Sequence, residues 1–100
     1  MNCSVSQNGS SATIEVEGRL TATEAPELEA AVEGLGEQTS NITMNLSGLE
    51  YIASAGLRVL VAAGKTAASR GGQLTIASPS KEVMDILEMT GLAGIFTIEK

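Results

Sequence analysis

The sequence of 100 residues has no histidine, no tryptophan, one cysteine, one tyrosine and one phenylalanine. Without histidine, the chain lacks the usual transition-metal ligand and the usual general base near pH 7. The single cysteine, Cys3, cannot form a disulfide within the chain. We therefore expect no metal site, no cofactor, no histidine-assisted hydrolysis and a core built from aliphatic side chains.

Long apolar runs and an excess of positive charge are also absent. No apolar run approaches the roughly 20 residues that a membrane-spanning helix needs, and the first ten residues have no signal-peptide pattern. The sequence contains six Lys and Arg residues and twelve Asp and Glu residues, which gives a formal net charge of -6. Nucleic-acid binding relies on cations that neutralise phosphates. We therefore expect a cytoplasmic protein that binds another protein, and neither nucleic acid nor a membrane.

The clearest pattern in the sequence runs from residue 42 to residue 70. Apolar and polar residues alternate from Ile42 to Leu46, as in a strand, and apolar or small residues recur at helical spacing from Leu57 onward. Ser54 lies between the two, where a helix N-cap is expected. There its hydroxyl would face unpaired backbone N–H groups and the positive end of the helix dipole. Any chemistry of the chain is expected at this position.

The flanking segments predict the remaining elements. These are strands over residues 3–8, 12–16, 73–77 and 96–98, a hairpin turn at Asn8-Gly9, a helix with its N-cap near Thr23, a helix with Pro79 at its first position, and a turn over 92–95. Strands that alternate with helices imply a partly parallel sheet. We expect one α/β domain over residues 1–100, with a mixed, mostly parallel sheet of about four to five strands, an N-terminal antiparallel hairpin and about three to four helices.

The order of these elements resembles the STAS domain, the sulfate transporter and anti-sigma factor antagonist family. The central match is the stretch from Asn45 to Leu57, which reads NLSGLEYIASAGL. Further matches are Gly18-x-Leu20, Gly71-Gly72 and Thr90-Gly91-Leu92, so the likeness covers nearly the whole chain.

The resemblance implies a function and a site. A stand-alone domain of this family is typically a bacterial anti-sigma factor antagonist, which binds an anti-sigma factor that is also a serine kinase and so frees a sigma factor. Phosphorylation reverses the binding, and a serine phosphatase is a further partner. The modified serine directly precedes a Ser-Gly or Ala-Gly pair, which corresponds to Ser54 here. The partner-binding residues implied are Ala53, Ser54, Ala55, Gly56, Leu57 and Arg58.

The resemblance makes the chain a kinase substrate and not an enzyme, and we expect it to be a monomer on its own. One residue departs from the family pattern, because many members carry aspartate directly before the serine and this chain has Ala53. The missing carboxylate keeps a second hypothesis open, in which the domain is a scaffold subunit of a signalling complex or of a lipid transporter, without a sigma factor.

The individual residues also allow alternatives. Ser54 alone fits a simple helix cap, an anion-binding helix N-terminus, or a nucleophile activated by Lys65 or a carboxylate. Arg58 fits either a solvated charge or a partner for a phosphate one turn away. Gly56 in a helix indicates close approach, either by a partner or by a neighbouring strand.

Overall fold

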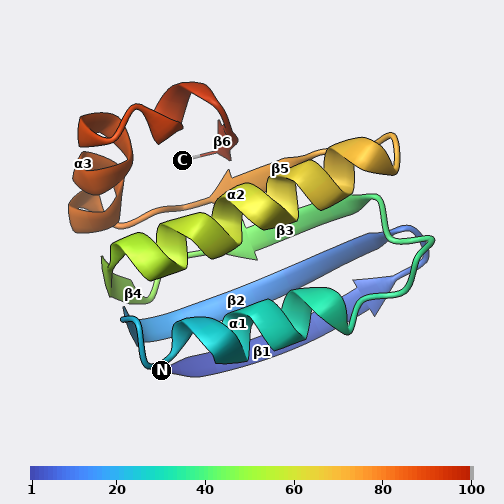
Figure 1. Ribbon diagram of the computed structural model, residues 1–100, viewed down its shortest axis with the longest axis horizontal. Coiled ribbons are helices and arrows are strands. Elements are labelled where there is room, and N and C mark those ends of the chain that lie inside the picture. Colours follow the sequence, from blue (N-terminus) through green and yellow to red (C-terminus); the bar gives the residue numbers. More distant parts are fainter. Residues whose placement is uncertain (100) are drawn as a thin grey trace.

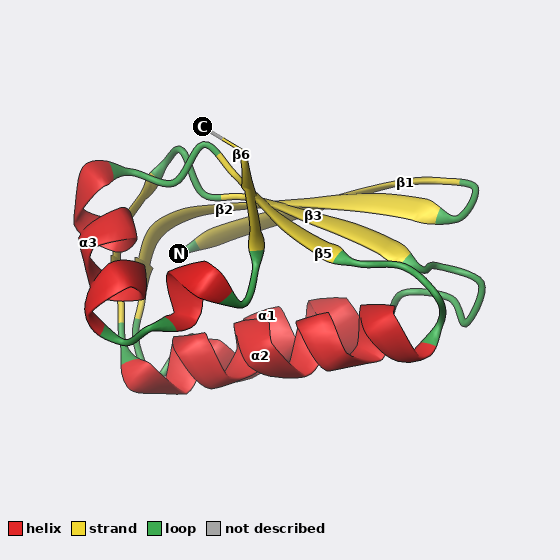
Figure 2. Ribbon diagram, turned by 90° about the horizontal axis from the view of Figure 1, so that it is seen from above, coloured by secondary structure: helices red, strands yellow, loops and turns green. Residues whose placement is uncertain are grey.

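The computed structural model describes residues 1–99, which form a six-stranded sheet with helices on one face and at one end (Figures 1 and 2). In chain order the elements are β1 (Asn2–Asn8), β2 (Ser11–Leu20), α1 (Ala25–Glu33), β3 (Asn41–Asn45), β4 (Leu49–Ile52), α2 (Ser54–Ser69), β5 (Leu74–Ala77), α3 (Lys81–Met89), the 3-10 turn η1 (Leu92–Gly94) and β6 (Thr97–Glu99). Helices α1 and α2 lie side by side under one face of the sheet (Figure 2). None of the helices in these residues is long and apolar enough to span a membrane.

The sheet confirms the predicted mixed topology. Its strand order is β1-β2-β3-β5-β6, with β4 paired to β2. The hairpin of β1 and β2 is antiparallel, and all other pairs are parallel. Strand β2 is ten residues long, so its first half pairs with β3 and its end pairs with β4.

The predicted count of four to five strands was wrong, since the sheet has six. The additional strand is β4, whose sequence lacks the alternating pattern of a strand. Its two middle residues, Glu50 and Tyr51, are both exposed, so apolar and polar positions do not alternate there. Pairing with the end of β2 makes this segment a strand, and that pairing is tertiary.

The core is aliphatic, as predicted. Along β2 every second side chain, Ala12, Ile14 and Val16, points to the helix-covered face and is buried. Among the helices, α2 contributes the most residues to the core. Its buried residues are Gly56, Leu57, Val59, Leu60, Ala63 and Ala67.

Three turns differ from their predicted form by about one residue. The hairpin loop consists of Gly9 and Ser10, since Asn8 already pairs with Ser11, and Gly9 takes the left-handed φ of 63° that such a loop needs. The N-cap of α1 is Glu24 rather than Thr23. Its carboxylate accepts hydrogen bonds from the Thr21 hydroxyl and backbone N–H, and the hydroxyl contact is the main cause that lowers the pKa of Glu24.

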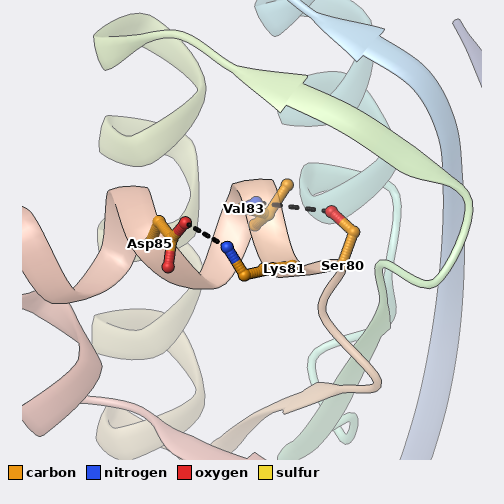
Figure 3. Close-up of polar contacts among 4 residues, drawn as sticks. All are labelled: Ser80, Lys81, Val83 and Asp85. Atoms are coloured by element: carbon orange, nitrogen blue, oxygen red, sulfur yellow. Dashed lines mark hydrogen bonds and ion pairs between the residues drawn. The ribbon is translucent and has the colours of Figure 1, made fainter.

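Pro79 precedes the N-cap of α3 and is not its first helical residue. The N-cap is Ser80, whose Oγ accepts a hydrogen bond from the Val83 N–H at 3.3 Å (Figure 3). The same hydroxyl donates to the Leu49 carbonyl at 2.7 Å. Ser80 therefore ties the start of α3 to β4, and an exposed ion pair between Lys81 and Asp85 follows on the next turn (Figure 3).

The first turn of α2 lies directly against the ends of β2 and β4. A Cβ atom at Gly56 would lie 2.7 Å from Leu20 Cγ and 2.9 Å from Ile52 Cγ1, closer than carbon atoms approach. The Ala53 N–H donates to the Leu20 carbonyl at 2.8 Å, which fixes the same junction through the backbone. Of the two explanations for Gly56, the structure supports close approach by neighbouring strands.

The turn between α2 and β5 is equally tight. Gly71 has a left-handed φ of 83°, and a Cβ at Gly72 would lie only 1.8 Å from the Ser40 carbonyl oxygen. Helix α2 therefore ends at Ser69, just before two glycines that the turn requires for different reasons.

We expect Gly72→Ala to destabilise the protein by more than about 2 kcal/mol, because the backbone of residue 40 must move to admit a methyl group. Thermal unfolding followed by circular dichroism measures this. Gly94→Ala is the control, since no atom lies within 4 Å of a Cβ there, and it should stay within about 0.5 kcal/mol of the parent. Equal melting temperatures for the two variants would contradict the contact at Ser40.

Two glycines of α2 should respond in opposite directions to the same substitution. Gly56→Ala overpacks the junction with Leu20 and Ile52 and should cost about 1–3 kcal/mol. Gly64→Ala meets only ordinary contacts, the nearest being Phe96 Cε1 at 3.6 Å, and should stabilise by about 0.5–1 kcal/mol. Urea unfolding of both variants checks the sign, and stabilisation by Gly56→Ala would show that the junction is loose.

Candidate functional site

Ser54 is the first residue of α2 and not its N-cap, which corrects the prediction by one position. The N-cap is Ala53, with extended φ and ψ of -87° and 169°. Its N–H is bound to the Leu20 carbonyl, so the chain enters the helix one residue earlier than the sequence pattern indicates. Ser54 is exposed, and no side chain caps the helix.

The start of α2 is electrostatically suited to negative charge. The first helical hydrogen bond runs from the Leu57 N–H to the Ala53 carbonyl at 3.0 Å, so the N–H groups of residues 54–56 precede the helical ladder. No acidic residue lies in the first turn. The positive end of the helix dipole is thus not neutralised by a carboxylate of the helix itself.

The six predicted partner-binding residues differ in exposure. The side chains of Ser54 and Arg58 are exposed, and those of Ala53 and Ala55 are half-buried. Gly56 and Leu57 are buried in the core. The surface that a partner can reach therefore consists of Ala53, Ser54, Ala55 and Arg58, while Gly56 and Leu57 hold this surface in place.

Arg58 lies between two shallow hollows. One, of about 340 Å³, lies between the starts of α1 and α2 and is lined by Ala22, Ala25, Pro26, Glu29, Ala55, Arg58 and Val59. The other, of about 360 Å³, is lined by Leu57, Arg58, Val61, Ala62, Lys65 and Leu92. Within residues 1–99 the only ion pair joins Lys81 and Asp85, so Arg58 makes no salt bridge there.

A contact between two exposed side chains near this site could not be predicted from the sequence. The Arg19 guanidinium lies 4.8 Å from the centre of the Tyr51 ring, and the two residues face each other in the β2–β4 pairing. Tyr51 is 38% exposed and lies three residues before Ser54. Only recognition of β4 as a partner of β2 would have revealed this contact.

The arrangement is poor for nucleophilic catalysis. Lys65 follows Ser54 by eleven residues on one helix, which separates them by about 16 Å along the axis. No carboxylate lies in the first turn either, so α2 offers no group to activate the Ser54 hydroxyl. In the part of the chain that the structure describes, no cluster of three or more Cys, Asp or Glu is placed to hold a metal ion.

Comparison with known proteins gives consistent results. The anti-sigma-B factor antagonist of Bacillus subtilis (strain 168) is 29% identical over 98 residues, which cover 98% of this chain and 90% of that protein. A crystal structure from Thermotoga maritima has a TM-score of 0.88 at 24% identity, covering 98% of this chain and 86% of the other. The Bacillus cell fate determinant SpoIIAA in its phosphorylated form has a TM-score of 0.78 at 14% identity, covering 99% and 92%.

A family model described as "Mlab, STAS domain" matches residues 3–98. This match spans nearly the entire chain, and the fold of the solved relatives agrees with it. The protein belongs to the STAS domain family.

Proposed function

We propose that this protein is an anti-sigma factor antagonist that is switched off by phosphorylation of Ser54. Unphosphorylated, it binds an anti-sigma factor serine kinase through the surface around the start of α2 and so frees a sigma factor. The chain is the substrate of that kinase and not an enzyme. The observation that carries the proposal is the exposed Ser54 at the uncapped start of a 16-residue helix. The name of the Bacillus subtilis relative supports the same role.

The modification is a phosphoryl transfer. The Ser54 Oγ attacks the γ-phosphorus of ATP, the bond to the β-phosphate oxygen breaks, and ADP and the hydroxyl proton leave. A serine phosphatase reverses the state by hydrolysis, which releases inorganic phosphate. The phosphoryl oxygens would lie near the first N–H groups of α2, with Arg58 one turn further along.

This location predicts a switch that does not unfold the domain. A phosphate at a helix N-terminus is tolerated or stabilising, because the backbone and dipole there favour negative charge. The chain is similar to SpoIIAA in both its unphosphorylated and phosphorylated forms, with TM-scores of 0.76 and 0.78. The change is therefore expected at the partner, which would meet added bulk and about -1.5 to -2 charges.

A second candidate function is a STAS scaffold subunit without a sigma factor, in a signalling complex or a lipid transporter. Two observations favour it. Residue 53 is Ala, which leaves no carboxylate before the serine for a kinase to recognise. The matching family model is described as "Mlab, STAS domain" rather than as an anti-sigma factor antagonist.

Phosphopeptide mass spectrometry on protein from its native cells distinguishes the two candidates. The switch predicts one phosphoryl group on Ser54 within the Tyr51 to Arg58 region, at a level that changes with stress or starvation. Complete peptide coverage without phosphate in any condition would favour the scaffold. A kinase and a phosphatase encoded beside the gene would favour the switch, and transporter genes the scaffold.

Substitution of Ser54 tests the charge mechanism directly. Ser54→Ala should bind the cognate anti-sigma factor as the parent does and resist inactivation by the kinase. Ser54→Asp should bind at least about 30-fold more weakly, equivalent to about 2 kcal/mol. Isothermal titration calorimetry with the purified anti-sigma factor measures both affinities.

Ser69→Asp is the matched control, because Ser69 is exposed at the opposite end of the same helix. It should bind like the parent. Melting temperatures should show that Ser54→Asp is folded, since its charge lies at the favourable end of the helix dipole. Parental affinity of Ser54→Asp would refute exclusion by charge.

A further inference from the structure

Strand β1 is a free edge of the sheet. Within residues 1–99 it pairs only with β2, and it lies at the border of the sheet with no element beyond it (Figure 1). Six of its seven residues are exposed. In an antiparallel ladder alternate residues direct N–H and C=O groups away from the partner strand, so β1 presents a row of unpaired backbone groups.

This edge lacks the usual features that prevent strand pairing. Natural edge strands carry charges, proline or bulges. The sequence of β1, NCSVSQN, has no charged residue and no proline, and its register with β2 is unbroken over all seven residues. Val5 is 47% exposed although its partner Ile14 is fully buried. The opposite edge, β6, has only three residues and includes Glu99.

The sequence of β1 is symmetric about Val5 except at positions 3 and 7, which are Cys and Gln. Serines stand on both sides of it, at positions 4 and 6, and asparagines stand at the two ends, at positions 2 and 8. When two such strands run antiparallel with Val5 on the axis, Val5 faces Val5, serine faces serine and asparagine faces asparagine. No like charges oppose each other in this pairing, although the chain as a whole carries a net charge of -6.

We propose that β1 pairs antiparallel with β1 of a second copy of this chain, with Val5 on the two-fold axis, so that one sheet continues through both copies. The same surface serves both copies, as in the commonest class of homodimer.

The interface is small, so the dimer is weak and reversible. A seven-residue strand extends over about 24 Å and buries far less than the roughly 800 Å² per partner of a stable complex. The monomer that the sequence predicts is then the form present at low protein concentration.

Helix α1 contacts β1 and carries Glu27, Glu29 and Glu33. Repulsion between the two acidic helices should weaken with salt, so association should increase with ionic strength.

The pairing leaves the Ser54 surface accessible. The first turn of α2, which carries Ser54, packs against the ends of β2 and β4, and β2 lies between this turn and the β1 edge. Two copies of the Ser54 surface would therefore be presented together, which raises the avidity for a partner that is itself bivalent.

Cysteine cross-linking tests both contact and register. In the double variant Cys3→Ser/Val5→Cys, residue 5 of one copy faces residue 5 of the other across the two-fold axis. The Cα atoms of such a pair are close enough for a disulfide. With oxidised glutathione this variant should form covalent dimers at least about tenfold faster than Cys3→Ser/Met89→Cys. Met89 is the control because it is 80% exposed at the end of α3, away from β1. Equal rates would overturn the proposal.

The native cysteine provides an internal check of the register. In the proposed pairing Cys3 faces Gln7, so the two Cys3 residues are about 13 Å apart along the strands and should not cross-link. Rapid disulfide formation by the parent chain would place the axis nearer Cys3 and overturn the Val5 register.

Opposite charges at residue 5 test the same axis without oxidation. Val5→Lys and Val5→Glu should each be monomeric by sedimentation velocity, and an equimolar mixture should associate at least as strongly as the parent. Circular dichroism confirms that each variant is folded, and Met89→Lys should associate like the parent. A parent chain that sediments as a monomer up to about 1 mM, or a mixture that does not associate, would overturn the proposal.

Discussion

The close contact between the first turn of α2 and the ends of β2 and β4 determines where the candidate site lies. Gly56 has no space for a side chain beside Leu20 and Ile52, and the Ala53 N–H is bound to the Leu20 carbonyl. These two restraints fix both the start and the direction of the helix. Ser54 consequently points to solvent at the uncapped end of α2. The exposed residues of the site are thus positioned by residues that a partner cannot touch.

Much of the fold could be predicted from local patterns. Strands β2 and β3 bury one face and alternate in sequence, and α2 has a long apolar face, so each element carries its own signal. Strand β4 has no such signal, because Glu50 and Tyr51 are both exposed. Its conformation follows from hydrogen bonding to β2 and from the Ser80 contact with Leu49. Contacts of this kind, between segments distant in the chain, leave no periodic pattern in the sequence.

The start of α2 could be predicted from the sequence to within one residue, and the contacts that set it could not. Ser54 and Arg58 are exposed, as contact with a partner requires, whereas Gly56 and Leu57, which the resemblance also implies as partner-binding, are buried. Gly56 is a close contact with neighbouring strands, which was one of its two interpretations. The N-cap was wrong by one residue because a tertiary hydrogen bond at Ala53, rather than the preference of serine for the cap, sets the helix boundary. The contact of Arg19 with Tyr51 was missed for the same reason as β4, since it exists only once the two strands pair.

The two proposed interactions, partner binding controlled at Ser54 and pairing of β1, depend on different forces and involve different parts of the molecule. Phosphorylation of Ser54 would act through charge at the start of α2, whereas pairing of β1 would use neutral backbone and side-chain groups at an edge of the sheet. Charge effects between exposed sites decay over about 8–10 Å at physiological salt. A phosphate on Ser54 should therefore change the affinity for a partner at α2 and leave β1 pairing unaltered. The absence of charged residues in β1 supports this separation, because the strand itself offers no charge on which a phosphate at Ser54 could act.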